Sequence, residues 1–551
     1  MSGAPVPGGG VTVTAVRRPA GGARLPRKGA AARLAALAAL ALAAAGCDVL
    51  GPLAPPPECS GTGSRLAASV SPLPGGSPYD AEFQAAGREF GVPAALLRSV
   101  GWTETRWQMV EGREELPGRP PAFGVMALRG ERLAAGARLA GVSERAARTE
   151  PSANIRAAAA LLDSLAGAAA VDRTAGPAAW APAVASYSGI RTPEGRAAFL
   201  RNGVYGALGV SLPEADARAA RASPAASSLA CPPAAPDDGQ AVWRPSPNYD
   251  RRPSGPAGDP HMVIVHTCEG SYAGCWSWLV RTASGVSSHY VVSENGGEIS
   301  QLVREADRAW HIAATYDCSL NAGHDCRLNG VQANGFTVGI EHAGFASQDS
   351  FPAAQIAASA ALVCRISQRL GIPRDFRHVV GHGRLQPDNR TDPGPDWPWT
   401  AYITSIQRDC GETVVDDSSA FLDGDVARVE APASWTPTDQ TSGYYAAGYR
   451  WTPASGTDDD PLVFSFRLAE AGRKSVDVRW TEGSNRSPAA RYLVVGAAGD
   501  TLASVQVDQR TGGGAWHELG SWSFPAGWNR IVLSRLGSSG TVVVGDAVRV
   551  R

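Results

Sequence analysis

Two proline-rich stretches divide this chain into segments that must fold separately. The first, Gly51–Pro57, is expected to be an extended tether, and the second runs from about residue 222 to residue 260. A chain of 551 residues exceeds what one hydrophobic core supports, so three domains are the natural expectation. Because the residue pattern changes at each break, we expect a multidomain protein whose parts belong to different fold classes.

The segment 64–221 is rich in alanine and leucine. Its apolar residues recur at helical spacing in Ala81–Phe90, Ala94–Trp102 and Asn154–Leu165. This pattern predicts an α-helical domain.

Residues 255–412, which follow a linker over 222–254, show strands that alternate with helices. Met262–Thr267 and Ser288–Ser293 have the pattern of short buried strands, and Pro352–Leu370 has that of a long amphipathic helix. The alternation predicts an α/β domain in which helices pack on a mixed sheet.

Residues 413–551 contain short β-rich runs separated by glycine-containing turns, and a β-sandwich is the simplest interpretation. The expected strands are Tyr492–Val495, Leu502–Val507, Arg530–Ser534 and Thr541–Val544.

The N-terminus has the pattern of an export signal over residues 1–47. Several arginines precede the apolar run Leu34–Ala45, which is too short to span a bilayer as a mature helix. The run leads into Ala44-Ala45-Gly46-Cys47, which resembles a bacterial lipobox, although Ala44 stands where leucine is usual. The resemblance implies lipidation of Cys47, a linker over 48–63, and an exported protein anchored to a membrane of the cell envelope. An ordinary cleaved signal peptide is the alternative.

Eight cysteines remain after Cys47, an even number that suggests disulfides in an oxidising compartment. Metal binding by these cysteines is the alternative, although no spacing among them resembles a zinc ribbon. The pairing we favour is Cys268 with Cys275, Cys318 with Cys326, Cys364 with Cys410, and Cys59 with Cys231.

The formal net charge of −1, with no basic stripe, argues against nucleic acid as a partner. The sequence leaves the oligomeric state open.

Eight of the nine histidines fall between His261 and His382. A catalytic zinc site needs three protein ligands and an open fourth position, and imidazole is the commonest ligand. His266 closes the apolar run VIVHT, while His382 and Asp392 lie where a strand end passes into a Pro/Gly-rich loop. Two histidines and a carboxylate form a known hydrolytic zinc set.

Five motifs then occur in one order: VIVHT, SSHYVVSENGGEISQLV, RAWHIA, NGFTVGIEHAG and GHGRLQPDNRTDPGP. Together they resemble the type 2 N-acetylmuramoyl-L-alanine amidases, whose fold is shared with peptidoglycan recognition proteins. The resemblance implies a zinc-dependent amidase that cuts peptidoglycan between N-acetylmuramic acid and L-alanine.

Carried over to this sequence, the resemblance makes His266, His382 and Asp392 the Zn²⁺ ligands. Glu341 falls where one branch of the family has its catalytic glutamate, which takes a proton from the attacking water. The alternative is that Glu341 only donates or accepts a hydrogen bond that supports a metal ligand, without taking part in proton transfer. His311 either contacts the substrate or packs beside the site.

Two positions depart from the family pattern. Arg390 stands where the family commonly has a lysine that stabilises the developing oxyanion, and a guanidinium can also donate to that oxygen. The chain contains only two lysines, which offers a compositional reason for the change. Ser288 precedes His289 where other branches have tyrosine, which favours the glutamate-using branch.

The helical segment resembles the lysozyme-like fold of lytic transglycosylases through FGVPAALLRSVGWTETRWQ, AFGVMAL and AVASYSGI. The resemblance makes Glu104 the acid that protonates the glycosidic oxygen. Thr105, Ala127 and Ser188 depart from the usual serine, glutamine and asparagine. A glycan-binding domain without catalysis is therefore the alternative.

The C-terminal segment resembles golvesin C-terminal-like modules through VDQRTGGGAWHELGSWSF and GDAVRV. We expect the matching residues to be turn and core positions that determine the fold, rather than a ligand-binding site. For the whole chain, the alternatives to an amidase are a non-catalytic peptidoglycan-binding envelope lipoprotein and a structural envelope lipoprotein.

Overall fold

The computed structural model of the protein describes residues 70–114, 118–212, 235–537 and 541–551. The signal segment with Cys47, the linker over 48–63, Cys59 and Cys231 lie outside these residues. Within the described ranges no helix is long and apolar enough to cross a membrane.

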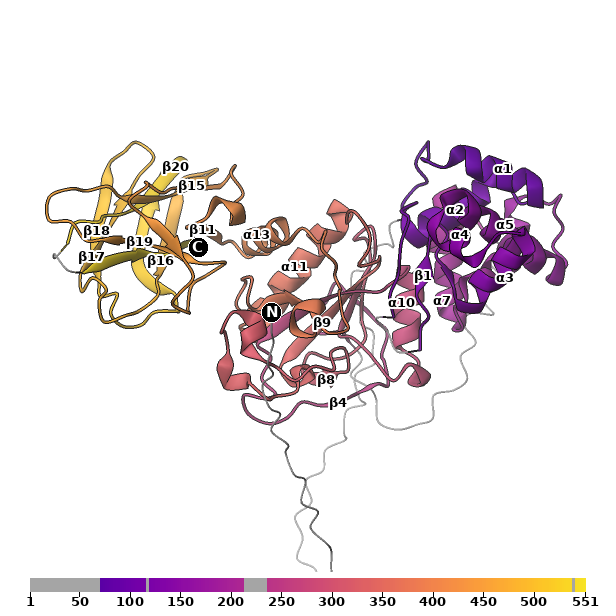
Figure 1. The fold of residues 1–551 in the computed structure, drawn as a ribbon, viewed down its shortest axis with the longest axis horizontal. Coiled ribbons are helices and arrows are strands. Elements are labelled where there is room, and N and C mark those ends of the chain that lie inside the picture. Colours follow the sequence, from indigo (N-terminus) through magenta and orange to yellow (C-terminus); the bar gives the residue numbers. More distant parts are fainter. Residues whose placement is uncertain (1–69, 115–117, 213–234, 538–540) are drawn as a thin grey trace, which may run out of the picture. The chain divides into compact units, whose positions relative to one another are not determined.

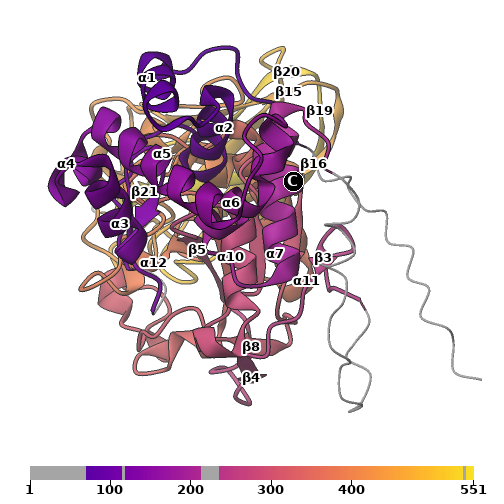
Figure 2. The same cartoon turned by 90° about the vertical axis from the view of Figure 1, so that its right-hand side faces the viewer.

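The helical segment forms a bundle that is drawn in indigo and purple (Figures 1 and 2). Its α-helices are α1 Asp80–Phe90, α2 Ala94–Thr105, α3 Gly130–Ala140, α4 Glu144–Thr149, α5 Pro151–Ala168, α6 Ala181–Ser188, α7 Pro193–Ala198 and α8 Tyr205–Leu208. A two-stranded hairpin of β1 (Ala122–Phe123) and β2 (Leu128–Arg129) follows α2. The three helices expected from periodicity are confirmed, with ends that differ by a few residues.

The bundle core is built around α5. Its alanines pack against α3 at a distance that only small residues allow, because a β-carbon added at Gly136 would lie 2.6 Å from the carbonyl oxygen of Ala157. The alanine-rich composition is therefore what lets these helices approach closely.

The second segment contains a six-stranded sheet in the order β10-β5-β9-β6-β7-β3. Its strands are β3 Val242–Trp243, β5 Met262–Thr267, β6 Tyr290–Val292, β7 Ile299–Gln301, β9 Thr337–His342 and β10 Val379–Gly381. The central strands are parallel, whereas β6 and β7 are antiparallel. The predicted mixed sheet is confirmed.

One face of this sheet packs against helices α11 (Ala353–Leu370) and α13 (Trp399–Asp409) (Figure 1). Val263 and Val265 of β5 belong to that apolar core. Because side chains alternate along a strand, the intervening residues of β5 point to the opposite face. The opposite face is covered by the segment between β8 (Asp307–Ala309) and β9. Two shorter helices also belong to this region, α10 (Tyr272–Leu279) and α12 (His382–Leu385).

Part of the segment expected to be a linker forms strands. Val242–Trp243 pairs with β7, and β4 (Tyr249–Arg251) pairs with β8. The run is polar and rich in proline, so its strand structure depends on partners some 60 residues away rather than on its own pattern.

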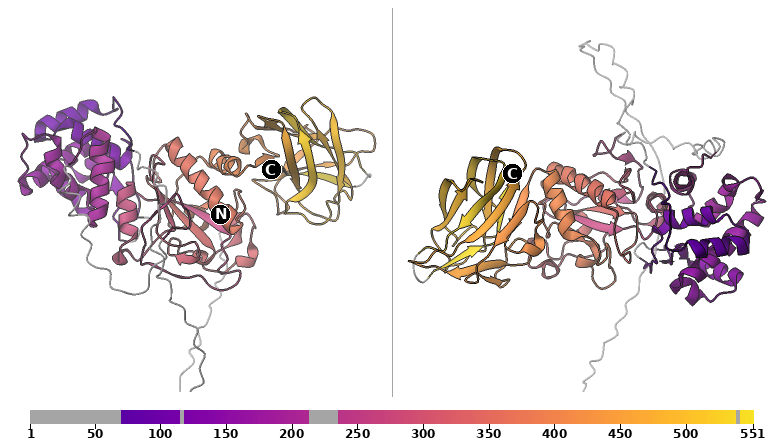
Figure 3. Two further views of the ribbon diagram at one scale, coloured as in Figure 1. Left: turned by 180° about the vertical axis from the view of Figure 1, so that it is seen from behind. Right: turned by 90° about the horizontal axis from the view of Figure 1, so that it is seen from above.

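The C-terminal segment is β-rich and is drawn in orange to yellow (Figure 3). Its strands are β11 Thr413–Asp416, β12 Ala427–Glu430, β13 Thr436–Thr438, β14 Tyr449–Pro453, β15 Leu462–Leu468, β16 Gly472–Arg479, β17 Ala490–Val495, β18 Thr501–Val507, β19 His517–Phe524, β20 Gly527–Leu533, β21 Val542–Gly545 and β22 Ala547–Val550. They form sheets of four, five and three strands, and all the pairs within them are antiparallel. The four strands expected from the sequence are present.

Three of the four predicted disulfides are also present: Cys268 with Cys275, Cys318 with Cys326, and Cys364 with Cys410.

Candidate active site

Two adjacent central strands carry the first pair of predicted site residues. His266 on β5 and Glu341 on β9 are partners in the parallel register. Their neighbours Val265 and Ile340 enter the core beneath α11, so His266 and Glu341 emerge together on the opposite face. Both side chains are buried. The sheet therefore holds the two residues side by side on rigid backbone.

The other two predicted ligands reach the same place from β10 and the loop after it. His382 begins α12 directly after β10, which pairs with β5, and Asp392 follows ten residues later. Asp392 Oδ2 lies 2.9 Å from His266 Nδ1, and its Oδ1 lies 3.2 Å from His382 Nδ1. One ligand atom from each residue lies within 4.8 Å of the others. All three residues are at most 4% exposed.

This set of side chains fits a zinc ion chemically. Burial lowers the pKa of His266, and the nearby His382 lowers it further, so the imidazole is neutral and able to bind a metal. Burial alone would raise the pKa of Asp392, but His382 and His266 together hold it well below its usual value. A neutral imidazole at His266, a second imidazole at His382 and an ionised carboxylate at Asp392 are groups that a zinc site takes as ligands.

His311 lies against His266. Its Nδ1 is 3.0 Å from His266 Nε2, and its Nε2 is 3.1 Å from the Thr337 hydroxyl. The ring rests on Gly339, where an added β-carbon would lie 2.6 Å from the imidazole. Burial and the neighbouring histidines lower the pKa of His311 far below its ordinary value. The structure thus brings His311, a third and neutral imidazole, beside the two histidines and the aspartate of the ligand set.

Arg390 also belongs to this neighbourhood. Its charge contributes to the lowered pKa of His266, and its Nη1 donates to the carbonyl oxygen of Asn389 at 2.9 Å. The predicted residues His266, His382, Asp392, His311, Glu341 and Arg390 therefore gather at one end of the sheet.

Gln386 is a site residue that sequence reasoning missed. Its Oε1 lies 3.1 Å from His382 Nε2, one helical turn farther along the chain. A hydrogen bond from Nε2–H to this oxygen leaves Nδ1 of His382, the nitrogen that faces Asp392, free to bind a metal. The four-residue spacing from His382 could have indicated the contact.

Glu104 lies apart from the histidines, near the end of α2 in the helical segment. Its carboxyl is only partly exposed, and burial raises its pKa to about 7, although Arg129 and Arg119 act against that rise. A carboxyl with this pKa keeps a proton near neutrality, as a general acid requires. Of the residues that depart from the lysozyme-like pattern, Thr105 donates to the carbonyl oxygen of Val125 at 2.6 Å and so fixes the hairpin beside Glu104.

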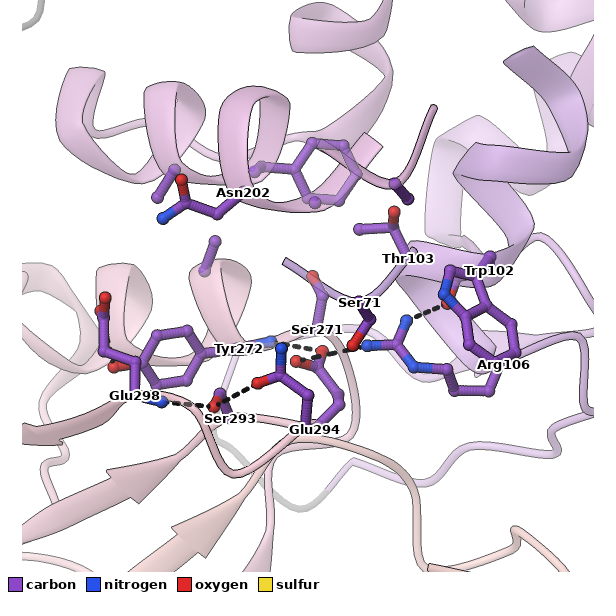
Figure 4. A pocket seen from close by; sticks show the side chains of 16 residues that line it. Ser71, Trp102, Thr103, Arg106, Asn202, Ser271, Tyr272, Ser293, Glu294 and Glu298 are labelled. Atoms are coloured by element: carbon purple, nitrogen blue, oxygen red, sulfur yellow. Dashed lines mark hydrogen bonds and ion pairs between the residues drawn. The ribbon is translucent and has the colours of Figure 1, made fainter. Parts of the chain in front are cut away.

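A separate pocket lies beside α2 (Figure 4). Trp102 and Arg106 line it on one side, and Tyr272 and Glu294 line it on the other. Arg106 lies 3.8 Å from Glu294 as an ion pair. None of the predicted site residues lines this pocket.

Comparison with known proteins identifies two regions of the chain. Residues 256–395 match the N-acetylmuramoyl-L-alanine amidase family, and residues 420–551 match the golvesin C-terminal domain. The six gathered residues all lie within the first match.

Three curated relatives are similar to parts of this chain. N-acetylmuramoyl-L-alanine amidase A of Achromobacter lyticus is 35% identical over 190 residues, which cover 31% of this chain and 95% of that protein. The 1,6-anhydro-N-acetylmuramyl-L-alanine amidase AmpD of Citrobacter freundii is 28% identical over 29% of this chain and 86% of its own length. Xanthan lyase of Bacillus sp. (strain GL1) is 29% identical over 40% of this chain, but this match covers only 22% of the lyase. The match that spans nearly all of the Achromobacter enzyme, together with the site geometry, shows that this chain belongs to the N-acetylmuramoyl-L-alanine amidase family.

Proposed function

We propose that this protein hydrolyses the amide bond between N-acetylmuramic acid and L-alanine in peptidoglycan, and that it does so with a zinc ion held by His266, His382 and Asp392. The observation that carries the proposal is the convergence of three buried ligand atoms within 4.8 Å in a member of this family. The names of the Achromobacter and Citrobacter relatives support the choice of substrate.

A zinc ion at these ligands would polarise the scissile carbonyl and acidify the attacking water. Glu341, held beside His266 by the strand register, takes the proton of that water and passes it to the leaving amine nitrogen. The guanidinium of Arg390 donates to the carbonyl oxygen as that oxygen gains negative charge. His311, which contacts His266, lines the place where the substrate binds.

A binding protein without catalysis is the competing function. Such a protein has no need of a complete ligand set, whereas here both imidazoles and the carboxylate are present and buried together. The geometry therefore favours the hydrolase.

Glu104 supports a second activity in the helical segment, in which it donates a proton to the glycosidic oxygen of the glycan strand. The raised pKa of about 7 is the observation that favours this activity over glycan binding alone. A comparison of wild type with Glu104→Gln for release of anhydro-muramyl products tests it, and equal release by both would overturn it.

Export and a lipid anchor on Cys47 complete the proposal, and they rest on the sequence alone. Metabolic labelling with a radioactive fatty acid, with Cys47→Ser as the unlabelled control, tests the anchor. Label in that variant would contradict it.

Mass spectrometry of purified peptidoglycan digested by the zinc-loaded full chain tests the main activity. We expect released stem peptides with a free L-alanine amino group. Intact muramoyl-peptide links after prolonged digestion would overturn the proposed function.

A further inference from the structure

A small pocket lies where the helical segment meets α10 of the amidase segment (Figure 4). The two segments pack tightly there, because Ala273 of α10 belongs to the helical core and a β-carbon added at Gly195 would lie 2.5 Å from the β-carbon of Ser277. The pocket encloses about 60 Å³. Pockets that hold a whole drug-sized ligand enclose roughly 300–1,000 Å³, so this one has the size for a terminal group of a larger molecule.

The charged side chains that line the pocket are already paired. Arg106 forms an ion pair with Glu294, whose Oε1 also accepts from the backbone N–H of Tyr272 at 2.9 Å. Glu298 lies 2.7 Å from Arg244 Nη2 and accepts from the Tyr272 hydroxyl at 3.0 Å. Because each carboxylate already has a guanidinium partner, the pocket suits an uncharged group.

Two neighbouring polar atoms on α2 have no hydrogen-bond partner within the part of the chain that the structure describes. They are the indole nitrogen Nε1 of Trp102 and the hydroxyl oxygen Oγ1 of Thr103, and both residues line the pocket. Thr103 is only 7% exposed. A buried donor or acceptor without a partner destabilises a protein, so a group that forms hydrogen bonds with both atoms is favoured here.

An acetamido group matches these features. Its carbonyl oxygen accepts from the indole N–H of Trp102, which can only donate, and its N–H donates to the hydroxyl of Thr103, which can also accept. Its methyl group lies against the apolar lining that Ala198, Phe199 and Ala207 provide. A sugar hydroxyl supplies a hydrogen bond but no methyl group for this apolar wall.

The pocket lies at the edge of the sheet that also carries the candidate active site. β5 and β6 flank β9 and run parallel to it, so their carboxyl ends lie at the same edge. Glu294 follows β6 and His266 lies near the end of β5, roughly 10 Å away, since neighbouring strands are about 4.8 Å apart. Burial raises the pKa of Glu104, and the charge of Glu294 raises it further, so the pocket is also near the proposed glycan-cleaving acid.

We propose that this pocket, the Trp102–Thr103 pocket, receives the acetamido group of a sugar in the glycan strand, next to the muramic acid residue whose lactyl amide occupies the amidase site. This inference rests on the proposed function, which supplies peptidoglycan as the substrate. Trp102 and Thr103 lie outside residues 256–395, which match the amidase family. The helical segment thus adds a specificity determinant to the amidase reaction.

Binding of two neutral trisaccharides to the full chain tests the pocket. Tri-N-acetylchitotriose carries acetamido groups, whereas cellotriose has hydroxyl groups in their place. We expect wild type to bind chitotriose at least about 5-fold more tightly in titration calorimetry, because two neutral hydrogen bonds and a buried methyl group distinguish the probes. Thr103→Val keeps the shape of the side chain without the hydroxyl, so it should weaken chitotriose binding by about 2–10-fold and leave cellotriose binding unchanged.

Three further variants separate recognition from folding and from the proposed glycan-cleaving site. Thr103→Ser keeps the hydroxyl and should bind chitotriose nearly as wild type does. Thr149→Val, at an exposed position at the end of α4, should match wild type with both probes. Glu104→Gln should keep the preference for chitotriose, because Glu104 does not line the pocket.

Three results would overturn the pocket. They are equal affinity of wild type for the two trisaccharides, chitotriose binding by Thr103→Val as tight as that of wild type, and loss of the preference in Glu104→Gln alone. Because binding needs no turnover, a chain that prefers chitotriose in this way but releases no stem peptides would contradict the proposed function and leave the pocket standing.

Discussion

Glu341 and His266 are register partners on the parallel strands β9 and β5, and both leave the same face of the sheet. A proposed base and a proposed metal ligand are thus fixed by neighbouring backbone hydrogen bonds rather than by a loop. Groups held this rigidly lose little freedom when the substrate binds, so their relative geometry is set before the reaction begins.

Glu341→Gln tests this pairing. The amide keeps the shape of the side chain but cannot accept the proton, so we expect kcat for stem-peptide release to fall by about 10²–10⁴-fold. Zinc content should stay unchanged, because Glu341 is not a ligand. Glu131→Gln, on the exposed part of α3, serves as the control. Unchanged kcat in Glu341→Gln would leave this residue a supporting hydrogen-bond partner only.

Gln386→Ala tests how His382 is oriented. Loss of the 3.1 Å contact to Nε2 frees the ring to turn, and such supporting contacts are worth about 10–100-fold in metal affinity. Competition with a zinc chelator measures the change. His382→Ala should abolish binding and sets the upper limit of the effect, while His261→Ala should bind zinc as wild type does. Equal affinity of Gln386→Ala and wild type would remove the orienting role.

Arg390 is tested by a pair of variants. Arg390→Ala removes the proposed donor to the developing oxyanion, and we expect kcat to fall by about 10²–10³-fold. Arg390→Lys restores a positively charged donor, so it should recover most of the kcat that Arg390→Ala loses, while KM changes little. If the lysine variant is as slow as the alanine variant, the charge at this position is not what the reaction uses.

The sequence was sufficient where local pattern determines structure. Met262–Thr267 is a strand with the predicted bounds, and α11 begins one residue after the predicted start. The ligands His266, His382 and Asp392 could be identified from the sequence because each lies in a motif that matches the family's motif order. Their approach to within 4.8 Å follows from the adjacent strands β5 and β10.

Contacts between distant segments could not be predicted in this way. β3 forms within the expected linker because Val242–Trp243 pairs with the edge strand β7 at Gln301 and its neighbour. No periodicity in Val242–Trp243 predicts this pairing. Arg119 donates to the carbonyl oxygen of Cys268, which lies about 150 residues later in the chain, and nothing in the sequence around Arg119 distinguishes it from other arginines. Tertiary packing decides such positions, whereas single-residue patterns do not.

The disulfides should stabilise the amidase segment to different extents. Cys364 and Cys410 are 46 residues apart and join α11 to the end of α13, while Cys318 and Cys326 are 8 apart. Loop-closure entropy then predicts losses of about 4 kcal/mol and about 2.5 kcal/mol when each pair is replaced by alanine. Calorimetric Tm values of the two double variants check the order. A larger drop for the short loop would contradict the entropic account.

The pH dependence of the C-terminal segment should be set by three buried aspartates. Burial raises the pKa of Asp546 to about 8 and that of Asp417 to about 7, while burial and the charges of its two neighbours raise that of Asp416 well above its usual value. The folded state therefore holds protons that the unfolded state releases from a pH of about 4 upward. The stability of this segment should be greatest at or below that pH and should fall as pH rises through about 8.

Asp546→Asn tests that sign. The amide keeps an oxygen for the Tyr445 N–H, which donates to Asp546 at 2.9 Å, and removes the titration. The Tm of the variant should match that of wild type near pH 4 and exceed it near pH 9. The difference in the free energy of unfolding at pH 9 should be at most several kcal/mol, since each unit of pKa shift corresponds to about 1.4 kcal/mol. Asp500→Asn, at an exposed turn, should follow the wild-type curve. Parallel curves for wild type and Asp546→Asn across this range would mean that the three carboxylates are compensated when ionised, and that their burial costs the fold nothing at neutral pH.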